Sequence, residues 1–331
     1  SGFSIDSLDL RAGERRVFAT GSLSSTAPQD FRASVVGFRI GTVADLIGFD
    51  DLAGTISGDL AVTGSAAEPV VDAAWVLDLD DSAARAVRWT SEVSYSSETL
   101  IVREELLQDG REAVTVDGTL PVRLRLPWQA DTTTAVVTSA PGAVDLRVVA
   151  DSASLGWLQN FASPLGYGRL DGTLDGEVTV SGRSDQPLLA GALDLTAGRV
   201  DMAGLGTTWS GVQGRAVLDG STVRIEGGQV SSGGGTLRAD GEVQLEELTV
   251  GAFDLQVTAT QFGAIDNSLA DATISGAGTI QGTIYNPVVV GALRILTGDL
   301  YLAGLEAGAV RDVTLTDADY QELQSIFGRD F

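Results

Sequence analysis

The chain has 331 residues, of which 44% are hydrophobic and 6% are aromatic. Acidic residues outnumber basic ones, 45 to 21, for a formal net charge of -24, and the sequence contains no cysteine, histidine or lysine. These counts exclude disulfides, thiolate metal sites and histidine-dependent catalysis, and the negative field disfavours nucleic acid as a partner.

The composition favours strands over helices, because Val, Leu, Ile and Thr are abundant while aromatic residues are scarce. No run reaches the ~18 uninterrupted apolar residues of a membrane helix. The best candidate, VVVGALRIL, is interrupted by Arg294. The chain begins with Ser1-Gly2 and shows no leader, so we expect a processed protein or a part of a longer one.

In chain order, strand patterns recur around single glycines. Residues 17–23 (VFATGSL), 114–122 (VTVDGTLPV) and 237–245 (LRADGEVQL) each place apolar residues at alternate positions beside a glycine. A period of two is typical of strands with one apolar and one wet face. Asp-Gly pairs at 219–220 and 240–241 predict tight turns.

A longer glycine–proline block occurs three times. Residues 176–205 match residues 276–305 without a gap, and residues 58–73 form an earlier, shorter copy. The shared positions are Gly64 and Pro69 in the first copy, Gly182, Pro187 and Gly191 in the second, and Gly282, Pro287 and Gly291 in the third. This self-similarity predicts a repeated structural unit.

Short segments with clustered apolar residues precede these blocks. Residues 43–49 (VADLIGF) and 155–161 (LGWLQNF) can form one or two turns of amphipathic helix, and residues 262–270 (FGAIDNSLA) are a weaker case. The patterns together predict a mainly β protein. We expect an elongated, curled antiparallel sheet, groove-like or taco-like, built from repeats of roughly 100 residues with short helices between them.

The domain organisation follows from these repeats. We expect a first, looser repeat region over residues 1–150, a second over 151–260 and a third, incomplete one over 261–315, all in one continuous unit. Residues 316–331 predict a C-terminal amphipathic helix with Thr316 as its N-cap.

The alternating apolar residues are the candidate binding surface. In a closed sheet they would be core, whereas in a sheet that curls without closing they would form a continuous trough. Such a trough could shield lipid acyl chains, at about 0.8 kcal/mol per buried methylene. The candidate lining residues are Leu60, Val62, Val178, Val180, Leu193, Leu195, Ile280, Ile284, Leu293, Ile295, Leu300 and Leu302.

Other chemistry is sparse, and we predict no catalytic residue, cofactor or metal. Asp78, Asp80 and Asp81 could offer oxygens to a calcium ion, but the run lacks the DxDxDG loop, so a solvated strand end is the better interpretation. The five tryptophans are far apart in the sequence, which favours core or rim packing over a sugar-binding platform.

At these residues the chain resembles the TamB family and its AsmA-like relatives. The shared features are a short DLIGF- or WLQNF-type segment followed by the glycine–proline block, and residues 170–198 and 276–298 fit best. The resemblance implies a tapered β-groove in the periplasm of a two-membrane bacterium. It also implies phospholipid acyl chains as ligands and a membrane-protein partner, a barrel assembly factor or another membrane complex, in outer-membrane biogenesis.

Two functional hypotheses stay open at this point. One is a lipid-binding or lipid-conducting segment of a TamB-like bridge. The other is a non-catalytic accessory subunit docked on the periplasmic side of a membrane complex. A β-helix or adhesin passenger is weaker, because such chains repeat every ~20–30 residues. An enzyme is the weakest interpretation.

Overall fold

The computed structural model describes residues 2–40, 54–80, 86–125, 137–156, 170–246, 249–283 and 286–300, and β-strands occupy almost all of these ranges. The strands are β1 (Gly2–Ala12), β2 (Arg15–Ser24), β3 (Gln29–Arg39), β4 (Gly54–Gly64), β5 (Pro69–Asp80), β6 (Ala86–Ser96), β7 (Thr99–Gln108), β8 (Arg111–Leu124), β9 (Val137–Ser139), β10 (Ala143–Ser154), β11 (Leu170–Arg183), β12 (Gln186–Met202), β13 (Thr207–Gly220), β14 (Thr222–Ser232), β15 (Gly235–Glu246), β16 (Thr249–Asp266), β17 (Ala270–Thr283) and β18 (Asn286–Leu300).

The strands form an antiparallel sheet in which neighbours in sequence are neighbours in space. The one exception is at β8, whose next partner is β10. The short strand β9 pairs with residues 122–124 of β8, and β10 pairs with residues 114–119. Strands β9 and β10 thus act as one interrupted strand, and the order of the sheet is preserved.

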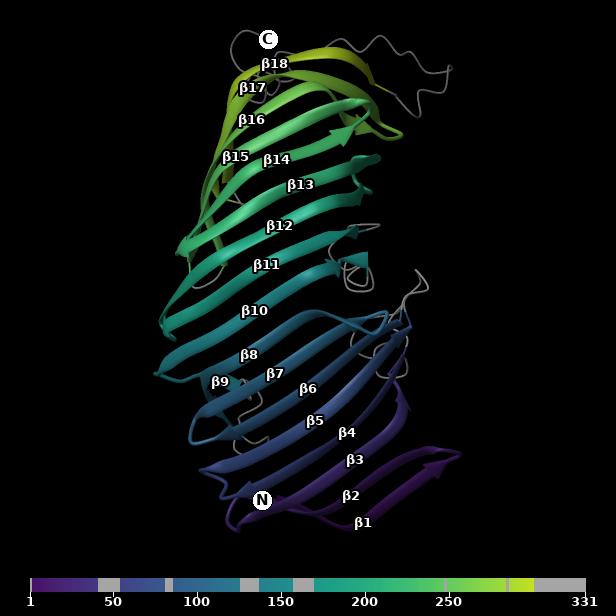
Figure 1. The fold of residues 1–331 in the computed structure, drawn as a ribbon, viewed down its shortest axis with the longest axis vertical. Coiled ribbons are helices and arrows are strands. Elements are labelled where there is room, and N and C mark those ends of the chain that lie inside the picture. Colours follow the sequence, from purple (N-terminus) through teal and green to yellow (C-terminus); the bar gives the residue numbers. More distant parts are fainter. Residues whose placement is uncertain are drawn as a thin grey trace, which may run out of the picture.

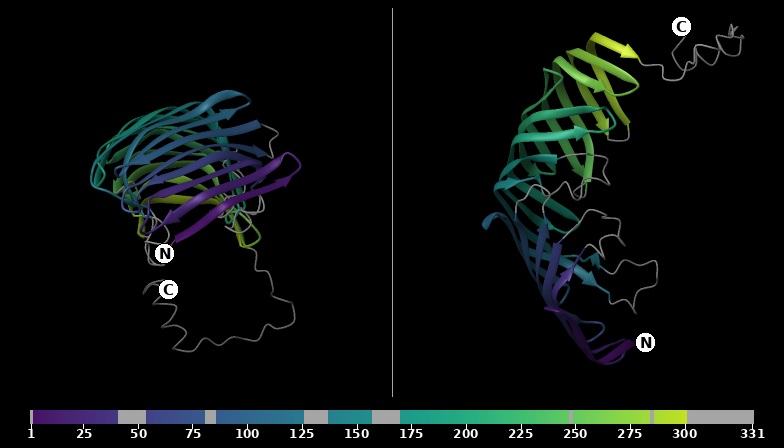
Figure 2. Two further views of the ribbon diagram at one scale, coloured as in Figure 1. Left: turned by 90° about the horizontal axis from the view of Figure 1, so that it is seen from below. Right: turned by 90° about the vertical axis from the view of Figure 1, so that its right-hand side faces the viewer.

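The sheet is elongated and open. Among the described residues β1 forms a ladder only with β2, and β18 only with β17. Figure 1 shows the strands stacked along the long axis, from β1 at one end to β18 at the other. Figure 2 shows the sheet curled into an arch when it is viewed along that axis. The predicted elongated, curled antiparallel sheet is therefore confirmed.

The three glycine–proline blocks form hairpins of the same register. Each block spans two strands, and its glycine pairs with its proline beside the turn. The pairs are Gly64–Pro69 in β4–β5, Gly182–Pro187 in β11–β12 and Gly282–Pro287 in β17–β18. The sequence similarity thus reflects equivalent hairpins, while the repeat length of roughly 100 residues stays a prediction.

The helix expected at residues 262–270 is wrong. Residues 262–266 continue β16, and β17 starts at Ala270 after a short turn. The side-chain oxygen of Asn267 accepts hydrogen bonds from the N–H groups of Leu269 (2.9 Å) and Ala270 (3.0 Å). This asparagine turn reverses the chain within a hairpin, because its side chain replaces a backbone acceptor.

The other predicted helices lie mostly outside the described residues. This applies to 43–49, to 157–161 within the second segment and to 316–331. In the part of the chain that the structure describes, no helix is long and apolar enough to cross a membrane.

The turn expected at Asp240-Gly241 is also wrong, because both residues lie within β15. Gly241 has a φ of 153°, and a Cβ atom there would collide with the carbonyl oxygen of Asp254 on β16. The glycine is required by this close approach of two backbones rather than by a turn.

Candidate functional site

One face of the sheet carries a continuous row of directly paired residues, which we call the axial row. It takes one residue from each of β1–β8 and β10–β18. In chain order the axial row is Leu10, Val17, Val35, Gly58, Trp75, Ser91, Glu104, Val116, Val148, Val178, Gly191, Leu218, Val223, Val243, Phe253, Gly282 and Pro287. Only Ser91 and Glu104 interrupt its apolar character. We call the face that bears it the inner face.

The inner face is the concave one. Trp209 on β13 and Phe262 on β16 have ring centroids 5.9 Å apart. In a flat sheet, residues on β13 and β16 would be about 14 Å apart, because three strand spacings of about 4.8 Å separate these strands. Both rings pack against one cluster with Val230 and Ala259. Side chains of non-adjacent strands can meet in this way only on the inside of a curled sheet.

The concave face contains an apolar hollow beside this cluster. Its volume is about 390 Å³, and strands β11–β15 line it. The lining includes Leu174, Leu193, Leu195, Ile225 and Leu237. A hollow of this size would hold a segment of hydrocarbon chain. Its lining offers few groups that could bind a polar molecule.

The sequence-predicted residues within the described side chains all lie on the inner face by register. Val62 and Val178 are buried, at 6% and 7% exposure, whereas Leu293 and Ile295 on the edge strand are 56% and 67% exposed. The inner-face set is Leu60, Val62, Val178, Val180, Leu193, Leu195, Ile280, Leu293 and Ile295. Ile284, Leu302 and the side chain of Leu300 lie outside the described part. That these residues line a binding groove stays a prediction.

The outer face carries the charges. Cross-strand ion pairs join Arg147 to Glu177 (2.7 Å) and Arg215 to Asp194 (2.6 Å). The hydrogen bond from Arg147 holds the pKa of the Glu177 carboxyl below its ordinary value. These pairs are exposed, so each adds little stability, but they keep this face polar and soluble.

Asp78 belongs to this charged face. Its carboxylate pairs with Arg88 at 2.7 Å, and Asp81 and the side chain of Asp80 lie outside the described residues. Among the described residues, no group of three or more acidic side chains is arranged to hold a metal ion.

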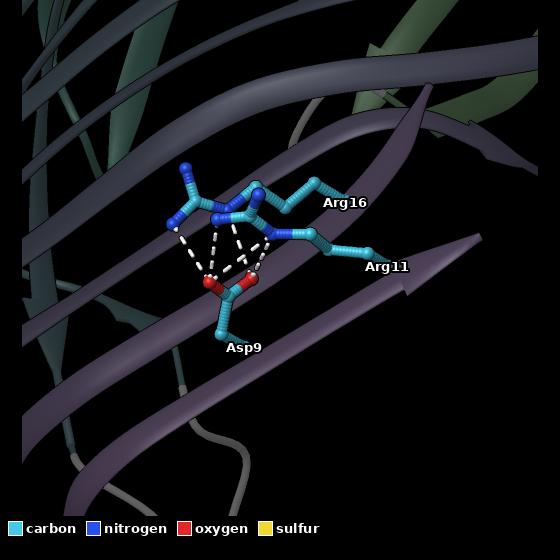
Figure 3. Close-up of polar contacts among 3 residues, drawn as sticks. All are labelled: Asp9, Arg11 and Arg16. Atoms are coloured by element: carbon cyan, nitrogen blue, oxygen red, sulfur yellow. Dashed lines mark hydrogen bonds and ion pairs between the residues drawn. The ribbon is translucent and has the colours of Figure 1, made fainter. Parts of the chain in front are cut away.

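A second outer-face cluster lies at the N-terminal end of the sheet. The Asp9 carboxylate accepts hydrogen bonds from Arg11 and Arg16, and the three side chains converge in Figure 3. The hydrogen bonds from Arg11 and then Arg16 lower the pKa of Asp9 from 3.8 to about 2. The Arg16 guanidinium also lies over the Phe18 ring, 5.1 Å from its centroid.

The two polar residues of the axial row, Ser91 and Glu104, were not predicted from the sequence. The Trp89 Nε1–H and the Ser91 hydroxyl donate hydrogen bonds to the two carboxylate oxygens of Glu104, at 2.6 and 2.7 Å. The sequence VREEL (102–106) contained a signal for this site, because Glu104 lies on the same strand face as the apolar Val102 and Leu106. The alternate residues Ile101 and Leu107 are also apolar, so the sequence did not show which set faces inward.

These features define a class of protein: an elongated, open β-trough that is apolar inside and charged outside. The family model for the TamB C-terminal domain matches residues 8–230 and 226–326, and the chain belongs to the TamB family. No curated protein and no solved structure matches the chain.

Membership gives a coarse functional assignment. The TamB family is associated with the bacterial envelope and generally supplies non-catalytic transport or assembly components. Its role lies in lipid transport and outer-membrane protein assembly, together with lipid and a membrane partner, TamA.

Proposed function

We propose that this chain binds lipid acyl chains along its inner face, as part of a periplasmic route for phospholipid that assists outer-membrane biogenesis. The observation that carries this proposal is the axial row, which is almost uninterrupted in its apolar character along the length of the sheet. Each methylene placed against such a surface gains about 0.8 kcal/mol. An acyl chain can slide along the row because no single position is required for binding.

The open edges of the arch support this proposal. A closed barrel would bury the axial row permanently, whereas the open sheet lets a chain enter from the side and leaves a charged headgroup in water. The outer face carries arginine–carboxylate pairs, whose charges favour water over hydrocarbon.

The proposal is tested by two aspartate variants on the edge strand. Leu293→Asp places a charge on the inner face, and Ala292→Asp places the same charge on the adjacent outer position. Leu293 is 56% exposed, so the protein should tolerate the substitution. We expect Leu293→Asp to reduce the phospholipid that co-purifies with the protein and its transfer between vesicles, while Ala292→Asp changes neither. Equal lipid content and transfer in both variants would exclude the inner face as the binding surface.

A docked, non-catalytic structural role is the second candidate, and the free edge of β18 favours it. Val288, Val289 and Val290 are 55%, 57% and 60% exposed, and β18 pairs only with β17 among the described residues. An exposed apolar edge is a template for another strand. Native gels after gentle detergent extraction test this role. A protein that migrates only as a free monomer would exclude it.

A further inference from the structure

Glu104 places a carboxylate on the inner face, and no basic side chain among the described residues pairs with it. It pairs with Ser91 on β6 and with Val116 on β8, so it shares the face of the axial row. None of the ion pairs in the described part of the chain includes it. Its neighbour Arg103 points to the outer face, where it pairs with Asp117 at 3.2 Å. The carboxylate therefore faces the trough without an ion-pair partner in the part of the chain that the structure describes.

The carboxylate is held in place but retains capacity to bind. Trp89 and Ser91 occupy one acceptor position on each oxygen, and a carboxylate has about four such positions. Both donors are neutral, so they fix the orientation of Glu104 without cancelling its charge. Ser91 is only 2% exposed, whereas Glu104 is partly exposed on the concave side.

Two tryptophans share the inner face with this carboxylate, one on each of the next two strands. Trp89 donates to it directly, and Trp75 on β5 is paired with Ser91. The face of a tryptophan ring attracts cations such as ammonium groups. The attraction is stronger when the cation is partly desolvated. A carboxylate with adjacent indoles suits an organic cation. It offers too few oxygens for calcium or magnesium, which take about six or more.

We infer that Glu104, with Trp75 and Trp89, forms a headgroup-selective station that binds the ammonium group of a zwitterionic phospholipid and disfavours anionic phospholipids. The inference rests on the proposed function, because the acyl chains must first occupy the inner face. The ammonium supplies the positive charge that the site lacks, and the acyl chains extend over Val116 and Val148 along the axial row. An anionic headgroup in the same place would meet only the negative charge of Glu104.

The test uses the purified full chain with an equimolar mixture of phosphatidylethanolamine and phosphatidylglycerol of identical acyl chains, in mild detergent. Native mass spectrometry gives the ratio of the two bound lipids. We expect the wild-type protein to favour phosphatidylethanolamine about fivefold, the scale of one charged or cation–π contact. Glu104→Gln should bring the ratio close to one, because the amide keeps the shape of the side chain and loses its charge.

Glu105→Gln is the matched control, since it removes a carboxylate from the adjacent position on the opposite face and should preserve the preference. Trp75→Leu should weaken the preference with Glu104 intact, so it serves if Glu104→Gln does not fold. A wild-type ratio near one, or a preference unchanged in Glu104→Gln, would overturn the inference while leaving the proposed function standing. Absence of both lipids from the wild-type protein would refute the proposed function itself.

Discussion

Trp209 on β13 meets Phe262 on β16 edge to face, with their ring planes inclined by 65°. Two intervening strands separate these rings in the sheet, so their contact ties the curl of the trough to side-chain packing. Phe262 is 3% exposed and belongs to the same cluster as Val230 and Ala259. The curvature of this region is therefore stabilised by hydrophobic burial and not by backbone pairing alone.

Removing this ring should loosen the curl. We expect Phe262→Ala to lower the free energy of unfolding by about 3–5 kcal/mol, because it deletes a buried aromatic ring and leaves a cavity. Hydrogen exchange should accelerate in β13–β16 before it does elsewhere. Phe3→Ala is the control, since Phe3 is 44% exposed. Equal losses of stability in the two variants would show that the cluster does not hold the curl.

A second prediction concerns the glycines of the inner face. Gly176 has a φ of 137°, and a Cβ atom there would collide with the carbonyl oxygen of Ala192 on β12. Gly176→Ala should cost about 1–3 kcal/mol, from backbone strain and a forced separation of β11 and β12.

The control for this glycine is Gly204→Ala, where a Cβ atom would meet nothing within 4 Å. That change should alter stability by less than about 0.5 kcal/mol. Urea unfolding midpoints at equal slope provide the measurement. A tolerated Gly176→Ala would mean that the two strands can separate at little cost.

A third prediction follows from Asp9. Its pKa in the folded protein is lowered from 3.8 to about 2 by its hydrogen bonds with Arg11 and Arg16. The stabilising contribution is therefore complete above pH 3.8 and is lost as the pH falls through about 2. Carboxyl-carbon NMR should show a midpoint near 2 in the wild-type protein. In the double variant Arg11→Gln, Arg16→Gln the midpoint should return towards 3.8, whereas a wild-type midpoint near 3.8 would show that the cluster does not form.

The strand pattern was predictable from sequence because its signal is local. Alternation at Leu193 and Leu195 depends only on which residues share a face, and the repeated spacing of Gly182 and Pro187 fixes a hairpin register. The expected helix at 262–270 failed for a physical reason. Clustered apolar residues there serve a strand end, where Phe262 packs across the curl onto Trp209.

The proposed headgroup-selective station could not be predicted from the sequence, because it depends on strand pairing. Trp75, Trp89 and Glu104 form no recognisable sequence motif, and no local pattern links either tryptophan to Glu104. Pairing of β5 with β6 and of β6 with β7 places the three on one face of neighbouring strands. Residues scattered along the chain can therefore form one site in a sheet of sequential hairpins.

Site-specific photocrosslinking can show whether lipid lies against the inner face. A benzophenone amino acid would replace Leu255 on the inner face or Gln256, the adjacent and more exposed residue on the outer face of β16. After irradiation of the protein in cells, mass spectrometry would identify phospholipid adducts. We predict adducts at position 255 and none at 256. Equal adducts at both positions, or adducts at 256 alone, would contradict it.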